Sequence, residues 1–355
     1  MALACVAVIM AADFLGAHQY WIGITLLLVP VMASFELSPR RTAAFGALAV
    51  VLLIWRYGLP RSQWNHIDAW ISIITVALGA AACVLACYRR ERRLGQLMKS
   101  RYTVEMLQHA LLHKLPVITD EALVAGFYRA AEDEANVGGD LYEVVGSPYG
   151  TRVLVADVQG KGLGALQLAA AVVTAFREAA YYLGEPLMVV ERMEQAVTRH
   201  RQRVQANGGT ADERFVTALV VELRRDGEIR LIDCGHPEPI AFSPTGVRTV
   251  PVAEPGLPLG LGELRDDCRR VHTLRLDPEE GLLLYTDGVN ESRDVRGAFY
   301  PLVRRLRQWT DLPRHALVRT LRADLDVFAR GTGRDDQAAL FIWQRVEPDS
   351  PAATA

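Results

Sequence analysis

The chain reads VGGDLY at residues 137–142 and LVADVQGKG at residues 154–162. Each segment has an aspartate close to glycine, Asp140 in the first and Asp157 in the second. Residues 153–156 form an apolar run that predicts a buried strand with Asp157 at its end. The glycines that follow allow a tight turn and the close approach of a ligand to the backbone. These segments therefore indicate strand ends that present carboxylates.

Two later segments repeat this arrangement. The apolar run 282–286 leads directly to Asp287, and Asp335 and Asp336 precede the apolar run 338–343. Carboxylates on rigid strand ends are oxygen ligands of the kind that Mg²⁺ and Mn²⁺ prefer. Each aspartate alone is also typical of a turn or a helix cap, and Asp-Gly after a strand is a common hairpin signal. The spacing by itself leaves both interpretations open.

Seven short motifs follow one another within residues 117–346. They are VGGDLY at 137–142, DVQGKG at 157–162, FVT at 215–217, CGHP at 234–237, PLGLG at 258–262, LYTDGVNE at 284–291 and DDQ at 335–337. In this order they resemble the stage II sporulation protein E-like branch of the metal-dependent (2C-type) protein serine/threonine phosphatases. The resemblance implies an antiparallel β-sandwich flanked by helices. The alternation of expected hairpins and helix pairs along the chain independently predicts an α+β domain with stacked antiparallel sheets.

The resemblance also implies a site for two Mn²⁺ or Mg²⁺ ions. The implied metal ligands are Asp140, Asp157, the carbonyl of Val158, Asp287 and Asp335, with Asp336 as the alternative to Asp335. Asp157 would bridge the two ions, and the four positions Asp140, Asp157, Asp287 and Asp335 form the implied catalytic set. Water activated by the ions would attack phosphoserine or phosphothreonine directly, without a phospho-enzyme.

Five further residues lie in or near the motifs. His236 is either a general acid for the leaving serine oxygen or a structural histidine in a packed turn, and the second interpretation is favoured. Lys161 either meets an anionic substrate or is a solvated surface residue. Arg129 is a candidate phosphate-binding residue. Phe215 and Thr217 are expected in the core near the site.

Composition limits the possible functions. The chain has 355 residues and a net charge of −2, so nothing suggests binding to nucleic acid. The cysteines have no CxxC spacing, which argues against a disulfide framework or a zinc site. The mean hydropathy of +0.11 is high for a soluble protein, and the apolar excess lies at the N-terminus.

Residues 1–88 are almost free of charge and contain four apolar segments, at about 2–14, 19–35, 42–57 and 68–88. They predict a transmembrane region of about four spans in contact with membrane lipid, although only the last segment has a comfortable length for a bilayer. A buried helical core is the alternative, but no polar helices are available to cover it. Arginines at 89–93 predict a multi-pass protein with a cytoplasmic catalytic domain, and Arg56 and Arg61 weakly disagree.

Residues 89–116 have apolar side chains at steps of three and four, which predicts an amphipathic linker helix ended by Pro116. This helix is either a spacer packed on the catalytic domain or a lever that forms a homodimer and relays a signal. Residues 117–346 form the expected phosphatase domain, and residues 347–355 form an expected disordered tail.

Together these features predict a membrane-anchored protein serine/threonine phosphatase in bacterial signalling. The resemblance implies a phosphoprotein substrate, such as an anti-sigma-factor antagonist. A non-catalytic membrane sensor or scaffold that binds a phosphoprotein is the alternative, and hydrolysis of a small phosphoester is a third possibility. The activating signal and the natural substrate cannot be predicted from the sequence.

Overall fold

The computed structural model describes residues 26–58, 66–130, 139–208, 213–264, 269–330 and 335–345. The chain divides into two compact units, Met1–Ser100 and Arg101–Ala355. Among the described residues, the first unit has one hydrophobic core and the second unit has two. The predicted segment 2–14, the start of segment 19–35 and the predicted tail lie outside the described residues.

The first unit is helical. It contains α3 (Leu28–Glu36), α4 (Pro39–Gly58) and the first part of α5 (His66–Leu111). A small core joins these helices through Leu26, Ala49, Leu53 and Val76. Many large apolar side chains of the same helices are exposed, among them Phe35, Trp55 and Trp70.

Two helices among the described residues are long and apolar enough to cross a bilayer. Ala69–Arg92 in α5 has a mean hydropathy of 2.3, and only 17% of its most apolar stretch is buried. The other, Leu163–Tyr182, is a half-buried helix of the second unit, as expected of a core helix in a soluble domain. Both helices pass on length and composition, and the low burial of Ala69–Arg92 makes it the candidate span of the two.

Helix α5 is continuous from His66 to Leu111. The sequence predicts a last span that ends at residue 88 and a linker helix that begins at residue 89. The structure has no break between them, since both lie within α5. The side chains of residues 93–111 lie outside the described residues, so the apolar face expected there stays a prediction.

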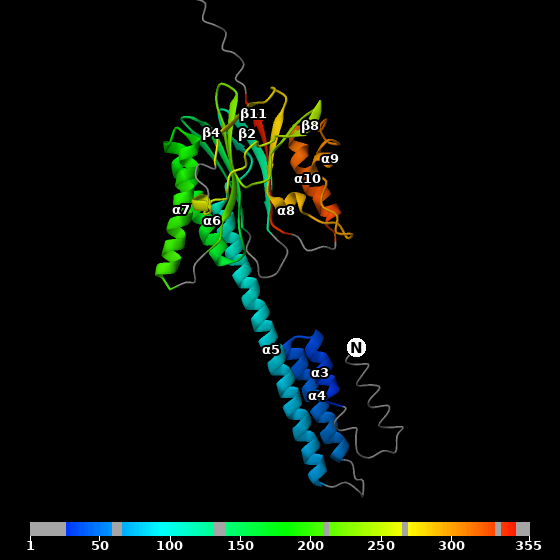
Figure 1. Ribbon diagram of the computed structural model, residues 1–355. Coiled ribbons are helices and arrows are strands. Elements are labelled where there is room, and N and C mark those ends of the chain that lie inside the picture. The colour runs from blue at the N-terminus through cyan, green and yellow to red at the C-terminus, as the bar shows by residue number, and fades with distance from the viewer. Residues whose placement is uncertain are drawn as a thin grey trace, which may run out of the picture. The chain divides into compact units, whose positions relative to one another are not determined.

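The second unit is built on two antiparallel sheets (Figure 1), which confirms the predicted fold class. The strand order of the first sheet is β1-β2-β11-β10-β7-β8, and that of the second is β3-β4-β5-β6-β9. The first sheet contains β1 (Val117–Ile118), β2 (Ala122–Arg129), β7 (Ile240–Ser243), β8 (Gly246–Thr249), β10 (Gly281–Tyr285) and β11 (Gln337–Gln344). The second contains β3 (Asp140–Ser147), β4 (Gly150–Val158), β5 (Val216–Leu223), β6 (Glu228–Cys234) and β9 (His272–Arg275).

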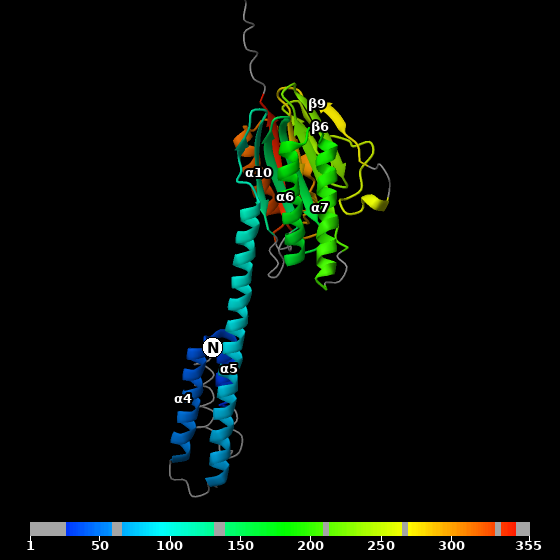
Figure 2. The same ribbon diagram turned by 90° about the vertical axis from the view of Figure 1, so that its left-hand side faces the viewer.

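Helices cover the outer face of each sheet. In Figures 1 and 2, α6 (Leu163–Tyr182) and α7 (Pro186–Ala206) lie side by side over the second sheet, where they contact β3 to β6. On the first sheet, α9 (Leu302–Leu306) contacts β8 and α10 (Arg314–Phe328) contacts β2. The short helix α8 (Asp287–Asn290) follows β10, and a 3₁₀ turn occupies Gly262–Leu264.

The central strands, such as β4, β10 and β11, are buried on both faces because each face meets other packed elements. In β10, Leu282 and Leu284 belong to the core shared by both sheets, whereas Leu283 belongs to the core that contains α9 and α10. This alternation follows from the two-residue period of a strand. It explains why these strands read as continuous apolar runs.

A buried arginine fastens α6 to the second sheet. Arg152 on β4 lies opposite Glu222 on β5, and its Nε donates to the Glu222 carboxylate over 2.7 Å. Its terminal nitrogens donate to the carbonyls of Ala180, Leu183 and Gly184 at the end of α6. Both charged side chains are fully buried, so the guanidinium satisfies orphan carbonyls of the helix end as well as a buried carboxylate.

Candidate metal centre

The register of the β3–β4 hairpin brings the first two predicted aspartates together. Asp140 opens β3 and lies directly opposite Asp157 near the end of β4. Asp140 is buried, and Gly139 immediately before it is buried as well. A Cβ on Gly139 would lie 2.6 Å from an Asp157 carboxylate oxygen and 2.2 Å from the Val158 carbonyl oxygen. Only glycine at position 139 therefore lets the Asp157 carboxylate oxygen and the Val158 carbonyl oxygen approach the backbone so closely.

The first sheet contributes the remaining carboxylates. Strand β10 ends at Tyr285, and Asp287 follows at the start of α8. The Thr286 hydroxyl donates to Asp140 Oδ2 over 2.5 Å and accepts from the Ala338 amide over 2.9 Å. Asp336, just before β11, accepts from the Gly139 amide over 3.1 Å. These contacts join the two sheets at the edge where the predicted ligands lie.

The adjacent residues Asp335 and Asp336 have different surroundings. Asp336 is buried and bonded to Gly139. The Asp335 side chain is 62% exposed and lies 3.1 Å from the Lys161 ammonium nitrogen. Lys161 therefore forms a salt bridge at the rim of the site, which places it beside any anion that binds there.

Burial, together with the crowding of like charges, raises the pKa values of these carboxyls. Burial and then the Asp157 carboxylate raise the pKa of Asp140 well above its usual range. Burial, followed by the charges of Asp287, Asp336 and Asp335, raises the pKa of Asp157 to about 7. Burial and then Glu291 raise the pKa of Asp287. The structure thus brings every predicted acidic ligand into one interacting group.

The chemistry of this group suits a hard divalent cation. All its potential metal ligands are oxygens, and a cation would relieve the repulsion that, after burial, raises the pKa values. As the side chains stand, no group of three or more His, Cys, Asp or Glu residues in the described part of the chain is arranged to hold a metal ion. The carboxylates of Asp140, Asp336 and Asp335 are instead bonded to protein donors.

His236 has the surroundings of a structural histidine. Its Nδ1 lies 3.1 Å from the Thr217 hydroxyl, and its Nε2 is buried without a hydrogen-bond partner. Burial lowers its pKa to about 3, so the imidazole is neutral near pH 7 and lacks the acidic imidazolium proton that a general acid donates. Asp233 accepts from the amides of Gly235, His236 and Gly256, which stabilises the turn around it.

The remaining candidates pack near the site without facing it as ligands. Arg129 donates both terminal nitrogens to Asp326, and only 13% of its side chain is exposed. Its charge is therefore committed to a structural ion pair. Thr217 lies opposite Asp157 on β5, and the Phe215 carbonyl accepts from the Gln159 amide. Both residues therefore lie near the site, but they are only partly buried and not in the core as expected.

Two features of the site were missing from the sequence-based predictions. One is Thr286, whose only local signal is its position directly before Asp-Gly in the LYTDGVNE motif. The other is a cavity of about 480 Å³ next to the carboxylates, lined by Asp287, Asp335 and the segment that follows α8. No periodicity or motif marks that segment as part of the site.

Comparison with known proteins agrees with this architecture. The family model for Stage II sporulation protein E matches residues 147–344. The SiaA-PP2C domain of Pseudomonas aeruginosa is 18% identical, with 72% of this chain and 98% of that one covered and a TM-score of 0.56. The RsbU and RsbW domains of a Mycobacterium tuberculosis protein are 21% identical, with 67% of this chain covered and a TM-score of 0.52. The chain spans 65% of the length of that second structure.

Proposed function

Because the chain belongs to the stage II sporulation protein E family of metal-dependent (2C-type) protein serine/threonine phosphatases, we propose that it hydrolyses phosphoserine or phosphothreonine in a protein substrate. The observation that carries this proposal is the group of carboxylates at the edge where the two sheets meet. Their raised pKa values mean that the ionised carboxylates are disfavoured without a cation, so a bound cation would stabilise the site.

Two Mn²⁺ or Mg²⁺ ions are the proposed cofactors. When bound, such a pair supplies Lewis acidity that activates water and offsets the charge of the phosphoryl group. The proposed ligands are Asp140, Asp157, the Val158 carbonyl, Asp287 and Asp335. We assign Asp335 rather than Asp336 because Asp336 is buried and holds the Gly139 amide.

The other residues of the site position these ligands. Thr286 orients the Asp140 carboxylate through its hydroxyl. Gly139 leaves room for the Asp157 carboxylate and the Val158 carbonyl. Lys161 places a positive charge at the rim beside Asp335, where it complements an anionic phosphoryl group.

The enzyme is proposed to be a multi-pass membrane protein with a cytoplasmic catalytic domain. The apolar helix Ala69–Arg92 and the exposed apolar side chains of α3, α4 and α5 support insertion into lipid. The basic residues at 89–93 support the orientation. An anti-sigma-factor antagonist is the proposed substrate class, and a homodimer through residues 89–116 is the proposed assembly.

The test follows phosphate release from a phosphoserine peptide and from p-nitrophenyl phosphate, with Mn²⁺ or EDTA. Wild-type activity that requires Mn²⁺ and is lost in Asp157→Asn supports the proposal. Asp311→Asn is the matched control, because it changes an exposed carboxylate in the loop before α10. Absence of Mn²⁺-dependent activity from the full-length protein with both substrates contradicts the proposal and favours a phosphoprotein-binding sensor or scaffold.

A further inference from the structure

Gln337 is a buried polar side chain at the edge of the metal centre. It is the first residue of β11 and directly follows Asp335 and Asp336. None of its surface is exposed, so its amide group must find hydrogen-bond partners inside the protein. The contacts that it makes there reach α8, the short helix that begins with Asp287.

Both ends of the Gln337 side-chain amide have partners. Its Nε2 donates to the Gly288 carbonyl over 3.2 Å and to the Ser292 hydroxyl over 2.7 Å. Its Oε1 accepts from an Arg129 terminal nitrogen over 3.4 Å. A carbonyl only accepts and a guanidinium only donates, so these partners determine which end of the amide faces α8. The nitrogen end faces Gly288, and the oxygen end faces Arg129.

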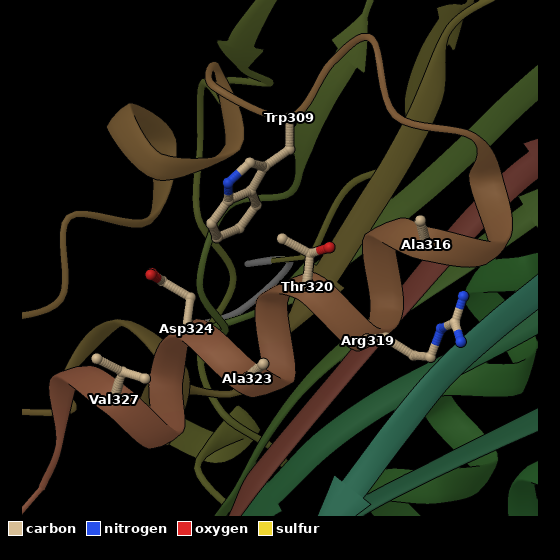
Figure 3. A pocket seen from close by; sticks show the side chains of 7 residues that line it. All are labelled: Trp309, Ala316, Arg319, Thr320, Ala323, Asp324 and Val327. Atoms are coloured by element: carbon tan, nitrogen blue, oxygen red, sulfur yellow. The ribbon is translucent and has the colours of Figure 1, made fainter.

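Ser292 completes this arrangement, because its hydroxyl accepts from Gln337 and donates to the Gly288 carbonyl over 2.7 Å. We call Gln337, Ser292 and Gly288 the amide clamp. The Ser292 carbonyl accepts from the Tyr300 amide over 2.8 Å. The Tyr300 hydroxyl donates over 2.5 Å to Asp324, which lines the groove on α10 shown in Figure 3. Ser292 is therefore connected to α10 as well as to β11.

Helix α8 lies directly against the backbone that precedes β11. A Cβ on Gly288 would lie only 1.8 Å from the Asp336 carbonyl oxygen, so the two backbones could not approach so closely with a larger residue at position 288. Gly288 directly follows Asp287, and Asp336 directly follows Asp335. The Gln337 amide thus joins the two backbone segments that present Asp287 and Asp335.

These two segments need a connection because their carboxylates repel each other. After burial and the charge of Glu291, the Asp335 carboxylate also raises the pKa of Asp287. Repulsion of this kind favours separation of Asp287 from Asp335 when no cation is bound. The amide clamp opposes that separation with hydrogen bonds between neutral groups, so it adds no further charge to the site.

We propose that Gln337 is a positioning residue that sets the spacing of Asp287 and Asp335 for a divalent cation. Its amide holds α8 against the start of β11, and the Ser292 hydroxyl supports it. The assignment rests on the proposed function, and it deepens it by naming the contact that keeps two proposed ligands at a fixed spacing before a cation binds. Removal of outer-shell hydrogen bonds of this kind typically weakens metal binding about 10- to 100-fold.

The experiment measures Mn²⁺ binding by the full-length protein in detergent. Electron paramagnetic resonance detects free Mn²⁺, so the dissociation constant is obtained without catalysis. Gln337→Met keeps the approximate length of the side chain and removes its hydrogen bonds. Ser292→Ala removes the hydroxyl at a half-buried position and is expected to fold. We expect the Kd for Mn²⁺ to rise about 10- to 100-fold in Gln337→Met and about fivefold in Ser292→Ala, which keeps the bond from Gln337 to Gly288.

A matched control lies at the other end of the same strand. The Gln344 Nε2 donates to the Gly227 carbonyl over 3.1 Å, so Gln344→Met also removes an amide-to-carbonyl hydrogen bond from β11. Gln344→Met should bind Mn²⁺ as tightly as wild type. An unchanged Kd in Gln337→Met overturns the proposal, and so does an equal rise in Gln344→Met. If circular dichroism in EDTA shows that Gln337→Met is unfolded, Ser292→Ala decides, and a Kd within about twofold of wild type then overturns the proposal.

Phosphate release from the same samples separates this proposal from the proposed function. If wild type binds Mn²⁺ but hydrolyses neither a phosphoserine peptide nor p-nitrophenyl phosphate, the phosphatase assignment fails, and weaker Mn²⁺ binding by Gln337→Met still supports the amide clamp. If wild type hydrolyses these substrates and Gln337→Met binds Mn²⁺ equally well, the phosphatase assignment stands and the amide clamp is rejected. A wild-type protein that binds no Mn²⁺ overturns both.

Discussion

Replacing Thr286 with valine removes one hydroxyl group and keeps the shape of the side chain. In the native domain that hydroxyl donates to Asp140 and accepts from the Ala338 amide, and Thr286 is fully buried. Thr286→Val therefore leaves a backbone N–H without its acceptor and a buried carboxyl without its donor. The two losses occur at the junction between the sheets.

The expected destabilisation follows from these two bonds. An unsatisfied buried donor costs about 1–3 kcal/mol, and the net contribution of an ordinary hydrogen bond is about 0.5–1.5 kcal/mol. Because the two bonds share one oxygen, their contributions are not independent, and we expect a loss of about 2–4 kcal/mol in the free energy of unfolding. Asp140 also loses a hydrogen bond that lowers its pKa, so Mn²⁺ should bind more weakly.

The assay is urea unfolding of the fragment Arg101–Ala355 in EDTA, followed by far-UV circular dichroism. This fragment contains both described cores of the second unit, and the described core of the helical unit lies before it in the sequence. Thr286→Ser is the control, because it keeps the hydroxyl and removes only a methyl group. Unfolding free energies of Thr286→Val and wild type that agree within about 0.5 kcal/mol would refute the role assigned to this hydroxyl.

Three further predictions follow from other contacts. Arg152→Met should lower the free energy of unfolding by about 3–5 kcal/mol, because the buried Glu222 then keeps only two arginine contacts, both at 3.9 Å, and the carbonyls at the end of α6 lose their donor; chemical denaturation checks this, and the double variant with Glu222→Leu should recover only part of the loss. The pKa of Asp157 is raised from 3.8 to about 7 in the metal-free fold. The folded state therefore binds a proton more tightly than the unfolded state does. Its stability should therefore fall as pH rises from about 4 to 7, and Mn²⁺ affinity should rise through the same window, with proton release measured by calorimetry in two buffers. Arg129→Ala should remove the ion pair with Asp326 and cost roughly 1 kcal/mol in stability, while phosphate release stays within about twofold of wild type; a loss beyond about a hundredfold would instead indicate a phosphate-binding role.

Local patterns were sufficient to predict the main strands and the α+β class. Apolar runs identified β4, β10 and β11 as buried strands, and glycine-flanked aspartates marked their ends. The structure begins β3 at Asp140 and ends β4 just after Asp157, as expected. These predictions depend on the two-residue period of a strand and on turn chemistry, which operate over a few neighbouring residues.

Partners that lie far apart in the sequence could not be predicted in this way. Thr286 and Asp140 are 146 positions apart, and Arg129 and Asp326 are 197 positions apart. The motif DDQ likewise left Asp335 and Asp336 equivalent, although burial separates them in the structure.

The sequence by itself determined which residues form strands and which strand ends present carboxylates, because backbone geometry and side-chain hydrophobicity act locally. Only the tertiary structure decided which of those ends meet. Sheet order places β10 beside β11, and the junction between the sheets brings Thr286 to Asp140 and Asp336 to Gly139. The pKa values of the site depend on this tertiary contact between strand ends. Loss of solvent and repulsion between carboxylates arise only when distant segments are packed together.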